Sequence, residues 1–259
     1  MATVIFLLLV LVYNVLVWFW RESVFFSVVF FPLSIVLSVL TIVLLVIILM
    51  PIFKLMKPNN RFFHYYVRSI FFLVLWLLNF RIRVHGKENL PKHQKFVLFP
   101  NHKSYCDILI VMTRLGRPIS IIAKKEIFKV PILSAYMRTA KVVPLNRNSD
   151  REALLTIKKG IENLENNIPM IIFPEGGRKN REDDKMVEMR AGAYKLATKP
   201  KADIIPVSIK GSAKISKTWI FGRKKIDIYF HKPMVSTEYE EISTNEIGEK
   251  IVATVNSVL

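Results

Sequence analysis

A histidine and an aspartate five positions apart are the residues of this chain best suited to chemistry. They belong to the run Asn101-His102-Lys103-Ser104-Tyr105-Cys106-Asp107, which follows a strand-like segment at 96–100. Open α/β sheets gather their sites at the carboxyl ends of strands. A histidine exchanges protons near neutral pH, and a carboxylate beside the ring fixes its tautomer and stabilises the imidazolium. The run therefore predicts proton abstraction by His102, oriented by Asp107.

The same run also permits a plain structural interpretation. Residues five apart do not share a face of a regular helix, although a loop entering a helix can fold Asp107 back onto the imidazole. Ser104 or Asp107 also suits the cap of the following helix, which would leave His102 incidental. Cys106 is the only cysteine, so no intrachain disulfide is possible, in agreement with a reducing compartment. We expect Cys106 to be a small buried residue at the helix start rather than a nucleophile.

A second run, Phe173-Pro174-Glu175-Gly176-Gly177-Arg178, follows the strand-like segment 169–173. Its glycines let backbone amides approach an anion closely, and its arginine suits bidentate contact with a phosphate. Its glutamate fits an anion site only if it orients the arginine or contacts a hydroxyl. Arg147, at the end of a third strand-like segment, is a second candidate for phosphate contact. Together these residues predict an acceptor held by its phosphate, with an ordinary glycine turn as the alternative.

The charge of the chain is confined to its later part. The formal net charge is +18, and through Phe53 the only charged residues are Arg21 and Glu22, which cancel. The excess therefore lies between Lys54 and Leu259. A basic domain beside an apolar segment favours an anionic membrane surface and anionic substrates. Nucleic acid is not expected as a partner, because the sequence has no zinc spacing, no nucleic-acid-binding signature and no interleaving of aromatic and basic residues.

Residues 1–58 are predicted to form a membrane anchor of two hydrophobic helices. Residues 2–20 are almost wholly apolar and residues 23–53 carry no charge, and about 20 apolar residues span a bilayer as helix. Residues 21–23 separate the helices, and Pro32 either kinks the second helix or marks its true start. A cleavable signal peptide is not expected, since no basic segment precedes the apolar run. A hairpin buried in a soluble core and a shallow hairpin in one leaflet are the alternatives to two full spans.

Residues 59–80 are predicted to form an interfacial helix that links the anchor to the next domain. Basic and aromatic residues mix there, as they do in helices at a membrane surface, although an ordinary core helix is the alternative. Positive charge marks the cytoplasmic side of a membrane. Basic residues follow the second apolar segment closely: Lys54, Lys57, Arg61 and Arg68. The domain is therefore expected on the cytoplasmic side.

Residues 81–259 are predicted to form one α/β domain, a largely parallel mixed sheet flanked by helices. Strands are expected at 81–85, 96–100, 119–123, 141–145, 169–173, 203–209 and 225–231. Helices are expected near 106–115, 131–139, 149–165, 190–199 and 237–258. The last helix has a possible capping box in Thr237 and Glu240. The charged stretch from Arg178 to Glu188 is expected to be an exposed loop.

Taken together, these residues resemble the lysophosphatidate acyltransferase family, the PlsC type of glycerolipid acyltransferase. The family's first hallmark, a histidine and an aspartate separated by four residues, is matched by His102 and Asp107, with Asn101 before them. Its second hallmark, phenylalanine-proline-glutamate-glycine-threonine-arginine, is matched by residues 173–178, except that Gly177 replaces the threonine.

Two further motifs follow in the order that the family has. A lysine-rich block leading to a proline corresponds to Ala123-Lys124-Lys125-Glu126 with Pro131, and the block ends in an arginine at Arg147. The family's aspartate before that arginine is an asparagine here, and its glycine after the proline is absent. A late proline-valine motif is met by residues 205–207. The match extends over residues 81 to 212, so it covers most of the predicted domain.

The resemblance implies an enzyme that makes phosphatidate from lysophosphatidate. His102 would take the proton of a glycerol hydroxyl while Asp107 orients it, and the oxygen would attack the thioester of an acyl-CoA or acyl carrier protein. That thioester is the donor substrate, and no cofactor or metal beyond it is implied. Membrane lipids and the lipid acceptor are the expected partners. The resemblance assigns the other motif positions to substrate binding, including the departure at Gly177: Asn101, Lys124, Arg147, Glu175, Gly176, Gly177 and Arg178.

Three alternatives stay open on the sequence. The departures at Gly177 and Asn146 leave room for another acceptor, such as another lysophospholipid, an amino-acid lipid or glycerol-3-phosphate. Metal-dependent phosphoester hydrolysis with His102 and Asp107 as ligands would need more ligands, and the other histidines have no ligand-like spacing. A non-catalytic membrane scaffold is the third alternative, although it would need none of the motif residues.

Overall fold

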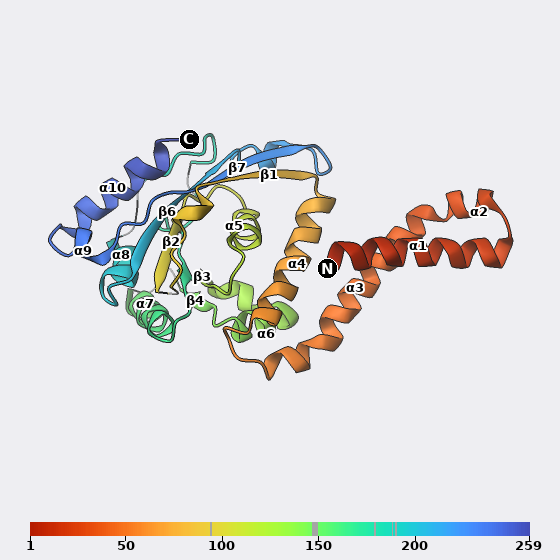
Figure 1. The fold of residues 1–259 in the computed structure, drawn as a ribbon, viewed down its shortest axis with the longest axis horizontal. Coiled ribbons are helices and arrows are strands. Elements are labelled where there is room, and N and C mark those ends of the chain that lie inside the picture. The colour runs from red at the N-terminus through yellow and green to blue at the C-terminus, as the bar shows by residue number, and fades with distance from the viewer. Residues whose placement is uncertain (94, 147–149, 179, 188, 190) are drawn as a thin grey trace.

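The computed structural model describes residues 1–259 except 94, 147–149, 179, 188 and 190. It consists of an α/β body built on one sheet and a helical hairpin that projects from the body (Figure 1). One helix, α4 (Arg61–Leu77), lies between the two parts and packs against both.

The seven strands of the described sheet occupy the seven segments that the sequence predicts. They are β1 (Phe80–His85), β2 (Phe96–Pro100), β3 (Ser120–Lys124), β4 (Val143–Leu145), β5 (Met170–Ile171), β6 (Asp203–Lys210) and β7 (Lys224–Phe230). Their order is β1-β7-β6-β2-β5-β3-β4, and each neighbouring pair is parallel except β6 with β7. The prediction of a largely parallel mixed sheet is therefore confirmed.

Strand β2 lies in the middle of the sheet and is buried on both faces, as its unbroken apolar sequence requires. Phe96 and Leu98 contribute to the core on one face, and Val97 and Phe99 to the core on the other. All four side chains are fully buried. Because β2, β5, β3 and β4 run parallel, the loops after their carboxyl ends meet at one edge of the sheet.

Helices cover both faces of the sheet (Figure 1). α5 (Asp107–Leu115) packs beside α4 on one face, where Ile110 and Leu75 belong to the same core. α7 (Asp150–Glu165), α8 (Ala191–Thr198) and α10 (Thr244–Asn256) share the core on the other face. The remaining helical elements are α6 (Pro131–Thr139), α9 (Ser236–Tyr239) and 3-10 turns at Lys87–Asn89, Lys125–Lys129 and Ile215–Lys217.

The single C-terminal helix predicted at 237–258, with its capping box of Thr237 and Glu240, is wrong. The structure divides this stretch into α9 and α10. The Ser243 hydroxyl accepts a hydrogen bond from the Glu246 backbone N–H at 3.2 Å, so the N-cap of the longer helix is Ser243. Tyr239 is buried, and its hydroxyl donates to the Ala202 carbonyl at 2.7 Å. Burial of this tyrosine ends the first helix before the second begins.

The hairpin consists of α1 (Ala2–Arg21), α2 (Val24–Val29) and α3 (Phe31–Lys54). The predicted break is confirmed, because Glu22 adopts a left-handed conformation with φ 47°. Pro32 lies in the first turn of α3 and marks the start of that helix. Two interhelical hydrogen bonds join α1 to α3, from Tyr13 to Thr41 at 2.8 Å and from Asn14 to Ser34 at 2.6 Å.

Both long hairpin helices have the length and composition needed to cross a membrane. Most of their apolar side chains are exposed, which suits a lipid environment rather than water. Small and polar side chains join the helices instead, as is common within bilayers. The hairpin therefore indicates association with a membrane.

Helix α4 has features of both an interfacial helix and a core helix, the two interpretations that the sequence left open. Its Leu73 packs in one cluster with Ala2 and Phe6, near the N-terminus of α1, while other side chains face the α/β core. Phe72 and Trp76 on the same helix are exposed. The helix thus has a core-packed face and an aromatic face that remains open.

Candidate active site

The structure brings His102 and Asp107 together at the carboxyl end of β2. His102 follows the strand, Asp107 is the first residue of α5, and the imidazole Nδ1 lies 3.0 Å from Asp107 Oδ2. The same carboxylate oxygen accepts the backbone N–H groups of Lys103 and Ser104, each at 2.8 Å. Its other oxygen accepts the Ser212 hydroxyl. These bonds fold the loop back over the helix start, so Asp107 both caps α5 and orients the histidine.

The imidazole presents one nitrogen to the site. Nδ1 is taken by Asp107, which leaves Nε2 for a substrate proton. The ring stacks on Phe173, with centroids 4.0 Å apart, and the side chain is only 17% exposed. Packing and the buried carboxylate therefore hold the ring in one orientation. A histidine arranged in this way is suited to act as a general base and then as a general acid.

Glu175 lies beneath the site. Its carboxylate pairs with the Lys103 ammonium at 2.9 Å, and both side chains are fully buried. The other carboxylate oxygen accepts the His102 backbone N–H at 2.9 Å. The two carboxylate oxygens of Glu175 thus join the loop after β2 to the loop after β5. The expected contact of Glu175 with a substrate hydroxyl or with Arg178 remains a prediction.

Asn101 also holds loops together. Its amide donates to the Asp184 carbonyl at 2.7 Å, and its side-chain oxygen accepts the Ile209 backbone N–H at 2.7 Å. It is fully buried, and the expected substrate contact of Asn101 remains a prediction. The Asp184 carboxylate in turn accepts the backbone N–H groups of Gly211 and Ala213, both at 2.7 Å.

The expectation of an exposed loop from Arg178 to Glu188 is confirmed for most of its described residues, and these bonds show where the loop is attached to the body. Asp184 is held in this way, and Met186 is buried in the core. Its backbone N–H donates to the Asn256 side chain at 2.8 Å. The described part of this stretch is charged at its surface but attached to the body at these points.

Arg178 lies against the loop that carries the histidine. Its guanidinium carbon is 3.3 Å from the centroid of the Tyr105 ring, a cation–π contact. Gly176, with φ 65°, makes the turn that returns the chain toward this loop. Gly177, which lies between Gly176 and Arg178 in the sequence, is half-buried. The fold therefore places a permanent cation and a glycine turn beside the proton-transfer pair, as the sequence predicts.

The other two predicted cations are Lys124 and Arg147, of which the structure describes only Lys124. Lys124 ends β3 at the same edge of the sheet, exposed and 3.6 Å from the Glu126 carboxylate. Arg147 lies outside the described residues. The expected substrate contacts of both residues remain predictions.

Cys106 is half-buried at the start of α5, and desolvation raises the pKa of its thiol. A protonated thiol is a poor nucleophile, so this environment favours His102 as the reacting group. Among the described residues, no three His, Cys, Asp or Glu side chains lie together in a way that could hold a metal ion.

Several residues of the site have no signal in the sequence. Lys103 and Tyr105 lie within the histidine run, but nothing in the run says that the lysine points inward and the tyrosine outward. Ser212 and Asp184 come from distant loops. The periodicity of apolar and polar residues predicts side-chain direction only within strands and helices. The direction of these loop side chains therefore cannot be predicted from it.

Comparisons with known proteins agree with the geometry. A family model described as Acyltransferase matches residues 81–210. The chloroplastic 1-acyl-sn-glycerol-3-phosphate acyltransferase LPAT1 of Arabidopsis thaliana is 28% identical over 78% of this chain and 56% of its own length. The 1-acyl-sn-glycerol-3-phosphate acyltransferase of Borreliella burgdorferi is 29% identical over 74% of this chain and 78% of its own length.

The fold has a solved counterpart as well. The crystal structure of the 1-acyl-sn-glycerophosphate acyltransferase PlsC from Thermotoga maritima is similar with a TM-score of 0.63 and 27% sequence identity, covering 75% of this chain and 79% of that one. The Saccharomyces cerevisiae relative is matched over 61% of its length. The chain thus spans about three fifths of the length of the curated relatives from Arabidopsis and Saccharomyces.

Proposed function

Because this chain belongs to the acyltransferase family, we propose that it transfers an acyl chain from a thioester donor to the free hydroxyl of lysophosphatidate, giving phosphatidate. The observation that carries the proposal is the His102–Asp107 pair, which leaves Nε2 facing the site, with the Arg178 cation on the same loop face. The relatives named as acyltransferases of 1-acyl-sn-glycerol-3-phosphate support this acceptor.

The reaction needs one proton shuttle. His102 Nε2 takes the hydroxyl proton of the acceptor while Asp107 stabilises the imidazolium through Nδ1. The oxygen attacks the thioester carbonyl carbon, and the carbon–sulfur bond of the tetrahedral intermediate breaks. The imidazolium then returns its proton to the leaving thiolate. Because a thiol leaves readily, the reaction requires no covalent enzyme intermediate, and we propose that it uses no cofactor apart from the donor.

We assign the acceptor phosphate to Arg178 and to backbone amides of the Gly176–Gly177 turn. A guanidinium held flat on Tyr105 keeps its edge available for bidentate contact with phosphate oxygens. Lys124 and Arg147 are the candidates for further contacts with the acceptor or the donor. Gly177, where the family has a threonine, removes a hydroxyl from this turn. This departure is the reason to test other acceptors, such as other lysophospholipids and glycerol-3-phosphate.

The membrane delivers the lipid acceptor and receives the product. The basic residues that follow α3 favour a catalytic body on the cytoplasmic side. The donor is an acyl-CoA or an acyl carrier protein, both of which are soluble and anionic and suit the basic body.

The deciding experiment measures acyl transfer by the purified full chain in detergent, with lysophosphatidate and either acyl-CoA or acyl carrier protein. His102→Ala should abolish product formation. The matched control is His93→Ala, which removes an exposed histidine paired with Asp203 and should keep wild-type activity.

Each outcome has a separate meaning. Phosphatidate formed with one donor only identifies that donor. Product with glycerol-3-phosphate or another lysophospholipid, but none with lysophosphatidate, keeps the reaction and changes the acceptor. Near wild-type activity of His102→Ala removes this residue as the base. Loss of wild-type activity with a chelator would redirect attention to metal-dependent chemistry.

A further inference from the structure

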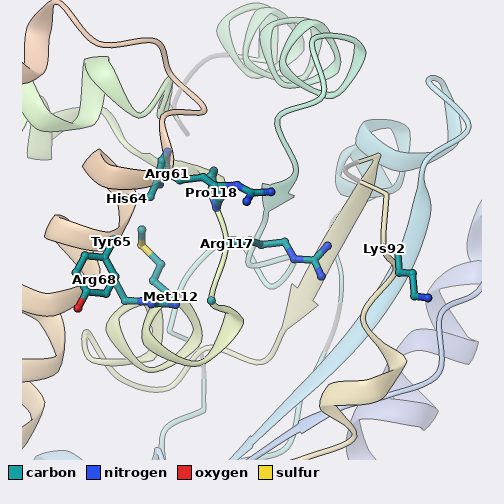
Figure 2. Close-up of a pocket in the computed structure, with 9 residues that line it drawn as sticks. Arg61, His64, Tyr65, Arg68, Lys92, Met112, Arg117 and Pro118 are labelled. Atoms are coloured by element: carbon teal, nitrogen blue, oxygen red, sulfur yellow. The ribbon is translucent and has the colours of Figure 1, made fainter.

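A pocket of about 450 Å³ lies at the edge of the sheet opposite His102. Figure 2 shows the side chains that line it. It opens between α4, the end of α5 and the segment before β2. Lys92 and Pro118 precede the amino ends of β2 and β3, whereas His102 follows a carboxyl end. The lining residues are Arg61, His64, Tyr65, Arg68, Lys92, Met112, Gly116, Arg117 and Pro118.

The lining is strongly basic. Four of the nine residues are permanent cations and none is a carboxylate. Within the described part of the chain, no Asp or Glu oxygen lies within 4.0 Å of the charged atoms of Arg61, Arg68 or Arg117, and the same holds for Lys92. Like charges that are gathered without counter-charge repel one another, so the protein alone leaves this pocket electrostatically unsatisfied.

Contacts hold Arg117 in place, and a glycine turn makes space for Arg68. Arg117 donates through Nη1 to the Pro91 carbonyl at 2.5 Å, and its guanidinium lies over the Phe96 ring. Gly116 is left-handed with φ 82°, and a Cβ on it would stand 3.2 Å from an Arg68 guanidinium nitrogen. The turn after α5 therefore leaves room for Arg68. Burial lowers the pKa of Arg117, and a bound anion would raise that pKa again.

We propose that this pocket is a second anion site, which binds a phosphate ester separately from the acyl-transfer site. Guanidinium groups meet phosphate oxygens in bidentate geometry, and Tyr65, Met112 and Pro118 supply apolar wall for the rest of the ligand. α5 starts at Asp107 and ends beside the pocket, so roughly 13 Å of helix separate the two sites. The proposal goes beyond acyl transfer and does not depend on it.

Two sources of this ligand chemistry are available. α3 ends at Lys54 and α4 begins at Arg61, so the pocket lies close to the end of a candidate membrane helix. The headgroup of an anionic phospholipid is therefore one source. A soluble phosphate compound is the other, and the experiment separates them.

The first arm measures binding of inorganic phosphate to the full chain in zwitterionic detergent by titration calorimetry. An Arg178→Gln background keeps the proposed acceptor site from contributing. We expect one bound phosphate, weakened roughly tenfold or more when Arg68→Gln and Arg117→Gln are added. Arg81→Gln with Arg83→Gln, two exposed arginines of β1, is the matched control and should leave the affinity unchanged.

The second arm identifies the source. The protein is placed in nanodiscs of phosphatidylcholine, with or without phosphatidylglycerol, and phosphate is titrated again. Phosphate binding that disappears with phosphatidylglycerol supports a lipid headgroup, and binding that persists supports a soluble phosphate compound. Either result agrees with an anion site.

Equal phosphate binding by the parent protein and its Arg68→Gln, Arg117→Gln variant would overturn the proposal. A variant with Arg68→Lys and Arg117→Lys is the control for misfolding. It keeps both positive charges, so it should retain measurable phosphate binding where the glutamine variant does not. A chain that binds phosphate here but transfers no acyl group would refute only the proposed function.

Discussion

Asp107 shows how much of the site depends on one buried carboxylate. It receives the imidazole, two backbone amides and the Ser212 hydroxyl, and it is fully buried. Its position explains how a histidine and an aspartate five residues apart can meet, since the loop wraps around the carboxylate before α5 begins. The contacts show that Asp107 caps the helix, and the same carboxylate also holds the imidazole as the catalytic prediction requires.

Replacement of this carboxylate should damage the chemistry more than binding. We expect Asp107→Asn to lower kcat roughly 10²- to 10⁴-fold, because an amide can donate to Nδ1 and so favours the tautomer with Nε2 protonated. Steady-state kinetics measure the effect, and the KM for the acceptor should change little. Ser212→Ala removes one bond to Asp107 and should have a smaller effect. A change confined to KM would contradict the orienting role.

Arg178 should act on the acceptor. We expect Arg178→Ala to raise the KM for lysophosphatidate roughly 10- to 100-fold, since a hydrogen bond to a charged group is worth about 1.5–3 kcal/mol. The KM for the donor, measured in the same preparation, is the internal control. An increase limited to the donor would reassign this arginine.

Glu175 is expected to matter for stability. Glu175→Ala removes the carboxylate that pairs with the fully buried Lys103 ammonium, and loss of one partner of a buried pair costs about 3–5 kcal/mol. Denaturant unfolding measures this loss. Glu240→Ala, which breaks an exposed pair with Lys201, should change stability little. A Glu175 variant as stable as the parent would mean that Lys103 finds other compensation.

Among the elements, the turn between β6 and β7 exposes three large apolar side chains. Trp219, Ile220 and Phe221 are each more than half exposed. Beneath them, the largely buried Lys224 ammonium donates to the carbonyls of Trp219, Ile220 and Gly222 at 3.1, 2.8 and 3.0 Å. The turn is therefore held rigid while it presents large apolar side chains.

This turn should enter the membrane interface beside the hairpin. A further bond to the Leu78 carbonyl places Lys224 next to the end of α4, near the exposed Trp76. In a variant with Trp18, Trp20 and Trp76 changed to Phe, we expect brominated lipids to quench Trp219 and iodide to quench it poorly.

The control for this experiment lies on α7, which is distant from the hairpin (Figure 1). Leu154→Trp, at an exposed position of that helix, with Trp219 also changed to Phe, should respond to iodide and not to brominated lipid. Efficient iodide quenching of Trp219 would place the turn in water.

For the whole molecule, buried histidines predict a pH dependence of stability. Burial lowers the pKa of His231 below its usual 6.5, and the ring is held by the Ser208 hydroxyl at 2.7 Å. The unfolded chain takes up a proton near pH 6.5 while the folded chain does not. Stability from this group is therefore complete above pH 6.5 and is lost as the pH falls below it.

His231→Gln should reduce this dependence. We expect the free energy of unfolding of the parent to fall between pH 7 and 5, and the fall to be smaller in the variant. Denaturant titrations at several pH values measure both slopes. Identical slopes for the parent and the variant would contradict the argument.

Residue types and periodicity alone determined the hydrophobic hairpin with its break at Glu22, the seven strand segments and the two motif runs. These features depend on local propensity and on apolar patterns, which are written along the chain. The family motifs also identified the histidine and the glycine turn before any contact was known.

Only the tertiary structure decided the direction in which the motif side chains point. Asn101 and Glu175 are turned inward, because loops from β2, β5 and β6 must be joined where the sheet ends. The same packing assembled a basic pocket from residues scattered between Arg61 and Pro118, and it divided the last helix at Tyr239. Such outcomes depend on contacts between distant segments, and no local pattern records them.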